Sequence, residues 1–272
     1  MNLASYFDRI GYRGRAKPDL PTLTAVLRAH VEAIPYENLD VQLGRPVTRA
    51  LPAIFEKIVG RWRGGWCYEM NGLFSWALEE IGFKVVRLAG GVFRETAGDS
   101  VVGNHLVPLV DLSETYLADA GFGNGPFQPQ PLREGQIRVG PMLCELKKVD
   151  GGWWRYVDDE KGGGPSFDFH PDVRDERLLE DRCRYLQTDP ASPFVLNAVV
   201  QRWLDEAHYS VRGRVLTKLS QQGRETRLIE GPDDYVATLK RDFALDLPDA
   251  ARLWPKIAAR HEVVMQEKAA AP

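Results

Sequence analysis

Apolar residues recur at helical spacing through the first part of the chain. Segments 20–34, 52–61 and 68–81 all show this pattern, which matches the period of an amphipathic helix. Pro35 stops the first segment, and Gly82 follows the third, where a helix C-cap glycine belongs. The sequence therefore predicts that the chain up to Gly82 is mostly helical.

After Gly82 the pattern changes to short runs rich in Val, Leu and aromatic residues. Glycine or charged residues separate these runs, which comprise 84–88, 91–94, 105–110 and 116–118. Such runs are typical of strands joined by turns. Asp150-Gly151-Gly152 then divides two further runs, 143–149 and 153–157, and Asp-Gly favours a tight hairpin turn. We therefore expect 84–185 to form an antiparallel β region.

Beyond Pro190 the helical and strand patterns alternate. A helix is expected near 194–204, followed by two strands and two helices at 208–219, 224–229, 233–243 and 250–262. This order predicts an α+β fold with three domains. The expected boundaries are 1–83 for the helical domain, 84–188 for the β domain and 189–272 for the mixed α/β domain.

The composition suits a protein with an ordinary buried core. Of its 272 residues, 44% are hydrophobic and 27% are charged, and the net charge of -3 argues against a nucleic-acid partner. The chain has no stretch of about 20 apolar residues, which a membrane span would need. Its first residues lack the basic and apolar regions of a signal peptide. We therefore expect a cytoplasmic protein with no membrane partner.

The cysteines bear on metal binding and on the cellular compartment. Three are present, Cys67, Cys144 and Cys183, and their wide spacing favours neither a disulfide framework nor a zinc site. No metal is therefore expected. A reducing cytosol, in which a thiol can be kept for reactivity, fits best.

The strongest chemical signal is the segment around Cys67. Gly64 and Gly65 precede it closely and the helical pattern starts immediately after it, so the thiol is predicted to lie at a helix N-terminus. The unpaired N–H groups and the dipole there favour an anion, and thiolate is the reactive form. The glycines would let a substrate carbonyl approach N–H groups able to stabilise an oxyanion. Alternatively, Cys67 is a small buried hydrophobic residue.

A nucleophilic cysteine needs a proton acceptor, and histidine has a suitable pKa. Four of the five histidines occupy an apolar helix stripe, a polar loop, a strand start and the last helix, at His30, His170, His208 and His261. The fifth, His105, opens the predicted strand 105–110 directly after a Gly-Asn turn. His105 is therefore the candidate base, although a lone histidine in a strand is often structural.

Asp119 is the candidate partner of this base. A hairpin centred on Leu112 would place Asp119 directly opposite His105. Opposed residues have Cβ atoms about 5 Å apart, within reach of an imidazole–carboxylate hydrogen bond that fixes the tautomer. A two-residue turn at 113–114 would break this register, and Asp119 could instead be a turn residue. The joint presence of thiol, imidazole and carboxylate favours the catalytic interpretation.

These segments resemble the arylamine N-acetyltransferase family. The resemblance is carried by RGGWCYEMN at 63–71, NHLVPLV at 104–110, ADAGFG at 118–123, YRG at 12–14, IPYENL at 34–39 and PASPF at 190–194. It spans nearly the whole chain. It implies a three-domain, cysteine-protease-like fold with an N-terminal helical bundle, an antiparallel β-barrel and a C-terminal α/β lid.

The resemblance also implies a reaction. Cys67 would be the nucleophile, His105 the base and Asp119 the residue that orients the base. Acetyl-CoA would acetylate the thiolate and CoA would leave. An arylamine, arylhydrazine or arylhydroxylamine would then take the acetyl group, which makes the reaction ping-pong.

Further roles follow from the same resemblance. The walls of the acceptor pocket would be Tyr36, Tyr68, Val92, Phe122 and Phe194. Aromatic walls would hold an arylamine by stacking, although ordinary core packing explains each residue equally well. Gly121 and Gly123 would let CoA approach the backbone, unless they belong to a plain turn-rich loop. A monomer and a homodimer are both compatible with the sequence.

Two other functions compete with acetyl transfer. A papain-like or transglutaminase-like cysteine hydrolase would use the same order of nucleophile, base and aspartate, but it would turn over an amide without acetyl-CoA. A degenerate relative would bind aromatic ligands with an unreactive Cys67. Release of CoA from acetyl-CoA only in the presence of an arylamine would distinguish these functions.

Overall fold

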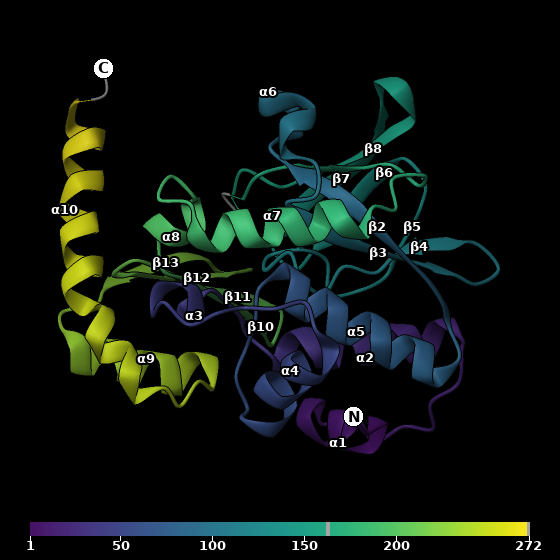
Figure 1. The fold of residues 1–272 in the computed structure, drawn as a ribbon, viewed down its shortest axis with the longest axis horizontal. Coiled ribbons are helices and arrows are strands. Elements are labelled where there is room, and N and C mark those ends of the chain that lie inside the picture. The colour runs from purple at the N-terminus through teal and green to yellow at the C-terminus, as the bar shows by residue number, and fades with distance from the viewer. Residues whose placement is uncertain (162–163, 271–272) are drawn as a thin grey trace.

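The computed structural model describes residues 1–161 and 164–270, and it shows helices packed against two antiparallel sheets (Figure 1). The N-terminal part holds α1 (Leu3–Ile10), α2 (Leu20–Ala33), α3 (Leu39–Gln42), α4 (Leu51–Phe55) and α5 (Cys67–Ile81). Gly82 ends α5 in the left-handed conformation, at φ 106°. The helices predicted at 20–34 and 68–81 are therefore confirmed.

The helix predicted at 52–61 is interrupted. Its first part is α4, and the next residues form a π-helical turn, η1 (Glu56–Gly60). The N–H of Arg61 donates to the carbonyl of Glu56, five residues earlier. Such turns widen a helix locally and are frequent at functional sites. This one carries Lys57, whose side chain is buried in spite of its charge.

The central part folds into an eight-stranded antiparallel sheet that curls into a nearly closed barrel. Its strands, in the order β5-β4-β3-β2-β9-β8-β7-β6, are β5 (Gln130–Pro131), β4 (Thr115–Leu117), β3 (His105–Asp111), β2 (Lys84–Val92), β9 (Phe167–Phe169), β8 (Trp153–Val157), β7 (Met142–Val149) and β6 (Gly135–Val139). The 3₁₀ turn η3 (Asp150–Gly152) joins β7 to β8 with both glycines at positive φ, as the Asp-Gly-Gly sequence predicts. The run at 84–88 and the first two residues of the run at 91–94 both belong to β2, which ends at Val92.

The β region expected at 84–185 also contains helices that we did not predict. Two are short, α6 (Arg94–Ala97) and η2 (Gly98–Val101), and the third is α7 (Glu176–Thr188). Asp175 caps α7 by accepting from the N–H of Leu178 at 2.9 Å. The helix buries Leu179, Cys183 and Leu186 in a cluster that includes Trp66, Cys67 and Tyr68. It therefore covers the start of α5.

The second sheet lies in the C-terminal part and has the order β1-β10-β11-β12-β13. Its strands are β1 (Tyr36–Glu37), β10 (Val199–Leu204), β11 (Ala207–Arg212), β12 (Val215–Ser220) and β13 (Gly223–Leu228). The helices of this part are α8 (Pro193–Leu196), α9 (Pro232–Phe243), η4 (Pro248–Leu253) and α10 (Trp254–Ala270). Because β1 comes from the N-terminal part and pairs with β10, this sheet is joined directly to the helical region.

The helix predicted near 194–204 is wrong. Only α8 is helical there, and β10 follows it. Strand β10 is hydrogen-bonded to β1 on one side and to β11 on the other, and it buries Val200 and Trp203. Hydrogen bonding to a neighbouring strand on each edge favours a strand here more than the local apolar spacing favours a helix. The strand predicted at 208–219 is also divided, because the turn at Gly213 separates β11 from β12.

Besides the cluster around Cys67, two larger apolar cores organise the described elements. The larger one joins the helices of the N-terminal part to the barrel and includes Phe74, Tyr156 and Phe167. The smaller one lies between the second sheet and α9 and includes Val211 and Phe243. The domain boundaries expected at 83/84 and 188/189 stay predictions.

Candidate active site

Cys67 begins α5, as the sequence predicts. Trp66 is the N-cap residue and has an extended backbone, so the N–H groups of Cys67 and Tyr68 lie in the first helical turn. Among the described residues, no acceptor pairs with either N–H group. Cys67 is 3% exposed, and its Sγ lies 3.8 Å from the carbonyl oxygen of Asn104. The thiol therefore faces the segment that leads into β3.

The two glycines before Cys67 meet a packing requirement. A Cβ at Gly64 would lie 2.1 Å from the carbonyl oxygen of Pro35, and a Cβ at Gly65 would lie 2.8 Å from the Cβ of Glu69. Neither position leaves room for a side chain. The close approach of the chain around Pro35 and of Glu69 explains both glycines, whereas the sequence pattern had suggested the approach of a substrate.

His105 opens β3, and its imidazole has an aromatic environment. The ring packs against Phe122 and Phe167, with centroid distances of 5.4 and 5.0 Å. Its Nε2 atom forms a hydrogen bond of 2.6 Å with Oδ2 of Asp119. The other ring nitrogen, Nδ1, is therefore left for the thiol of Cys67.

The structure brings His105 and Asp119 together, but the register proposed for this contact is wrong. Leu109 pairs with Leu117, so the hairpin centres on Ser113 and not on Leu112. Strand β4 ends at Leu117. Asp119 reaches the imidazole from the loop beyond the strand, and no cross-strand pairing is involved.

Asp119 is held in place by Asn71, which the sequence patterns did not single out. Nδ2 of Asn71 donates to Oδ1 of Asp119 at 2.7 Å and to the carbonyl of Leu106 at 2.6 Å. The N–H of Gly121 donates to the same Oδ1 at 2.8 Å. Asn71 lies four residues after Cys67, so both residues share one face of α5. That spacing was a signal available in the sequence.

The surroundings of His105 favour its protonated form. Burial lowers the pKa of His105, but the carboxylate of Asp119 and a hydrogen bond with the thiol of Cys67 raise it more, to about 10. His30 and His208 are buried without a carboxylate partner, and burial lowers their pKa values to about 3. An imidazolium at neutral pH stabilises a thiolate beside it.

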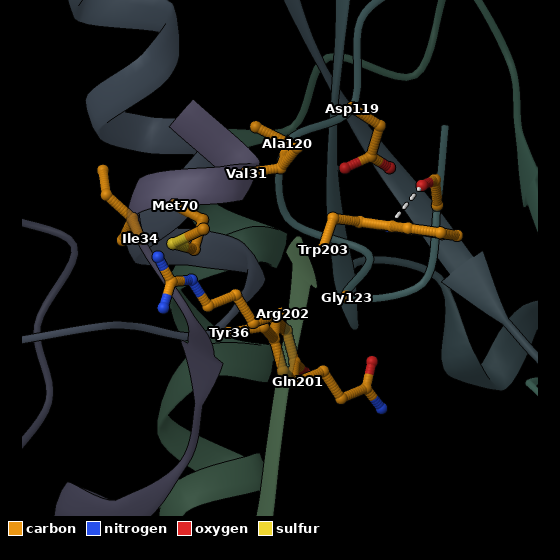
Figure 2. A pocket seen from close by; sticks show the side chains of 11 residues that line it. Val31, Ile34, Tyr36, Met70, Asp119, Ala120, Gly123, Gln201, Arg202 and Trp203 are labelled. Carbon is orange, nitrogen blue, oxygen red and sulfur yellow. Dashed lines mark hydrogen bonds between the residues drawn. The ribbon is translucent and has the colours of Figure 1, made fainter. Parts of the chain in front are cut away.

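The five expected pocket residues come from different parts of the fold. Tyr36 lines a small cavity of about 10 Å³ together with Asp119, Gly123, Gln201 and Trp203, as Figure 2 shows. The indole N–H of Trp203 donates to the carbonyl of a neighbouring loop glycine at 3.1 Å (Figure 2). A space of this size holds about one water molecule, so it is too small for an aromatic ring.

The other four expected pocket residues surround the reacting groups from different elements. Phe122 packs on the imidazole of His105. Phe194 packs edge-on against the N-cap indole of α5 at 5.2 Å, and the hydroxyl of Tyr68 donates to the carbonyl of Gly103 at 2.7 Å. The N–H of Val92 donates to the side chain of the residue before His105 at 2.7 Å. Phe122 is therefore in direct contact with the candidate base.

Gly121 and Gly123 are both packed against protein atoms. A Cβ at Gly121 would lie 2.7 Å from Nδ2 of Asn71 and 2.9 Å from Cα of Cys67. A Cβ at Gly123, where φ is +84°, would lie 2.0 Å from Oε1 of Gln201. Packing thus explains why both are glycines, and their contact with CoA stays a prediction.

In residues 1–161 and 164–270, no group of three or more His, Cys, Asp or Glu side chains is arranged to hold a metal ion. No helix in these ranges combines the length and the apolar character that a membrane crossing needs.

Known proteins resemble this chain over almost its whole length. The model of an N-acetyltransferase family matches residues 19–252. The arylamine N-acetyltransferase of Mycolicibacterium smegmatis is 35% identical, with 92% of this chain and 94% of the relative covered. Arylamine N-acetyltransferase 2 of Mus musculus is 34% identical, with 80% of this chain and 83% of the relative covered.

Solved structures agree with these sequence matches. The arylamine N-acetyltransferase of Mycobacterium marinum in complex with CoA has a TM-score of 0.85 at 31% identity, covering 94% of this chain and 98% of that one. The enzyme of Salmonella typhimurium has a TM-score of 0.84 at 27% identity, with the same coverage. The predicted α+β fold is thereby confirmed. The chain belongs to the arylamine N-acetyltransferase family of acyltransferases.

Proposed function

We propose that the chain transfers the acetyl group of acetyl-CoA to an arylamine or arylhydrazine through an acetyl-cysteine intermediate at Cys67. The observation that carries this proposal is the 2.6 Å hydrogen bond between His105 and Asp119. The thiol of Cys67 contributes to the raised pKa of the same imidazole. The solved Mycobacterium marinum relative is a complex with CoA. That complex supports a CoA thioester as the acetyl donor.

In the first half-reaction, His105 holds the thiol proton on Nδ1, and the thiolate of Cys67 attacks the carbonyl carbon of acetyl-CoA. The N–H groups of Cys67 and Tyr68, which lie in the first turn of α5, would stabilise the oxyanion. The bond between the acetyl carbon and the CoA sulfur then breaks. The CoA sulfur takes the proton from His105, which leaves an acetyl thioester and a neutral imidazole.

In the second half-reaction, the acceptor nitrogen attacks the acetyl carbon on Cys67. The neutral imidazole of His105 accepts a proton from that nitrogen through Nδ1. The carbon–sulfur bond breaks, and the N-acetylated product leaves a thiolate beside an imidazolium. Throughout, Asp119 bonds Nε2, which fixes the tautomer that can exchange a proton at Nδ1.

Phe122 is the pocket residue best placed to bind an aromatic acceptor. Its ring is 5.4 Å from the ring of His105 and 4.6 Å from that of Phe167. An arylamine stacked here would lie near the acetyl group on Cys67. We propose that Tyr36, Tyr68, Val92 and Phe194 complete the pocket when side chains move to admit the ring.

The test is CoA release by the purified protein, followed by chromatography. Acetyl-CoA alone should release one equivalent of CoA per enzyme, and sustained release should require an arylamine or arylhydrazine. Cys67→Ser should release none in either case. Sustained CoA release without an acceptor, or turnover of a peptide amide without acetyl-CoA, would contradict the proposal and favour a papain-like or transglutaminase-like hydrolase.

A further inference from the structure

A cluster of charged side chains lies beneath the first turn of α5 and has no part in the steps proposed above. The cluster comprises Glu37, Asp40, Lys57, Arg63 and Glu69, each at most 8% exposed. These residues come from β1, α3, η1, the segment before Trp66 and α5. Five separate segments of the N-terminal part therefore meet at this cluster.

Glu69 connects the cluster to the nucleophile. Both carboxylate oxygens of Glu69 lie 2.9 Å from Nζ of Lys57. Oε2 also accepts a hydrogen bond of 3.3 Å from the N–H of Trp66, the N-cap residue directly before Cys67. The same side chain packs against Gly65, where a Cβ would lie 2.9 Å from Oε2. The carboxylate therefore contacts the backbone immediately before the thiol.

Lys57 anchors this carboxylate from the π-helical turn. Its Nζ lies 2.9 Å from Oδ2 of Asp40 as well as from Glu69. Asp40 pairs with Arg63 at 3.1 Å, and Arg63 pairs with Glu37 at 2.6 Å. A continuous series of ion pairs, running from Glu37 through Arg63, Asp40 and Lys57, thus holds the carboxylate of Glu69 at the start of α5.

Stability alone gives little reason for this arrangement. Taking several charges out of water is unfavourable, and apolar residues of similar size often stabilise a core equally well. Burial raises the pKa of Glu69 to about 7; Lys57 opposes this rise, and Glu37 and Asp40 add to it. Lys57 therefore favours the charged form of Glu69. A charged side chain with several partners is rigid, and catalytic geometry tolerates little displacement.

We propose that Glu69 and Lys57 are positioning residues for acetyl transfer. The pair fixes the N-cap of α5, and with it the Sγ of Cys67 and the N–H groups that would receive the oxyanion. This inference rests on the proposed function of Cys67. Because neither residue contacts the substrate in this scheme, loosening the pair should slow the acetylation of Cys67 without weakening the binding of acetyl-CoA.

The test is rapid-quench acetylation of the full chain with acetyl-CoA alone. Glu69→Ala should lower the maximal rate constant at least about tenfold, while the half-saturating acetyl-CoA concentration should change by less than about twofold, the signature of a positioning role. Glu79→Ala is the matched control, because it removes an exposed ion pair of 2.6 Å with Arg87 from the other end of α5. It should acetylate at the wild-type rate.

The amplitude of the acetylation reaction measures the fraction of protein molecules with a folded site. The rate constant reports the geometry of that site. Lys57→Met leaves Glu69 without its cation and should slow acetylation. The double variant Lys57→Met/Glu69→Gln removes both charges and keeps an oxygen for the N–H of Trp66, so it should recover most of the rate. If Glu69→Ala yields no folded protein, the acetylation rate constants of Lys57→Met and of the double variant decide whether the inference holds.

Three results would overturn the inference: a wild-type rate constant in Glu69→Ala, a loss confined to the amplitude, or no recovery in the double variant. Failure of all three variants to fold would make the pair a folding determinant and would overturn it too. If the wild-type protein itself forms no acetyl-Cys67, the proposed function fails instead.

Discussion

Replacing Asp119 with asparagine tests the electrostatic basis of the candidate site. The amide has nearly the same shape, and its oxygen can still accept from Asn71 and Gly121 as Oδ1 does now. The fold should therefore be retained. Its NH₂ group would face Nε2 of His105, where Oδ2 now accepts. An amide donor there forces the ring proton onto Nδ1, and this tautomer cannot take the proton of Cys67.

The size of the effect follows from the buried histidines of the same protein. The pKa of His105 is raised from 6.5 to about 10, which corresponds to roughly 5 kcal/mol in favour of the imidazolium. Without the carboxylate, burial should dominate, as it does at His30 and His208, where the pKa is about 3. We therefore expect the pKa of His105 to fall below 6.5 in Asp119→Asn. Acetyl transfer at pH 7 should drop by a factor on the order of 10⁴, as in the serine-protease triad.

Nuclear magnetic resonance of the His105 ring, followed over pH in both proteins, measures the first quantity. Acetyl transfer from acetyl-CoA to an arylamine at pH 7 measures the second, and circular dichroism checks that the fold is kept. An Asp119→Asn protein whose His105 still titrates above pH 7, or which transfers acetyl groups at the wild-type rate, would refute the reasoning.

Asn71→Ala should slow acetyl transfer at least about tenfold and lower the free energy of unfolding by about 1–3 kcal/mol, because it leaves buried hydrogen-bond partners unsatisfied. Steady-state kinetics measures the first effect and urea unfolding the second. Unchanged values would contradict the role given to Asn71. Gly121→Ala should lower the thermal midpoint more than Gly231→Ala, because its Cβ would lie 2.9 Å from Cα of Cys67, whereas a Cβ at Gly231 has nothing within 4 Å. Equal midpoints would count against the packing argument. In a Cys67→Ala protein, where Asp119 still raises the pKa of His105, the ion pair should add stability that is complete below pH 6.5 and is lost as the pH rises above that value. An unfolding free energy that stays flat or rises over this range would contradict the ion pair.

Local patterns in the sequence predict where Cys67 and His105 lie in the fold. The start of α5 at Cys67 follows from the two glycines and the apolar spacing after them, and the start of β3 at His105 follows from the Gly-Asn turn. The contact of His105 with Asp119 is present although the register proposed for it is off by one position at the turn. Asp119 lies in the loop after β4, and Asn71 holds it in place from α5. The alternation of residues along a strand therefore could not predict how the contact forms.

Features that depend on distant segments could not be predicted in the same way. Lys57 and Glu69 are twelve positions apart, and a π-helical turn brings them together, so no helical spacing links them. Strand β10 forms because β1 and β11 pair with its two edges, which its own residues do not reveal. Helix α7 is a different case, because its cap at Asp175 and its apolar spacing were readable.

The central claim is that Cys67 carries the acetyl group. Mass spectrometry of the peptide that contains Cys67, after mixing the protein with acetyl-CoA alone, tests it most directly. We expect one acetyl group on that cysteine, lost on addition of an arylamine as the N-acetylated product forms. An unmodified Cys67 in a protein that still converts arylamine to product would contradict the account.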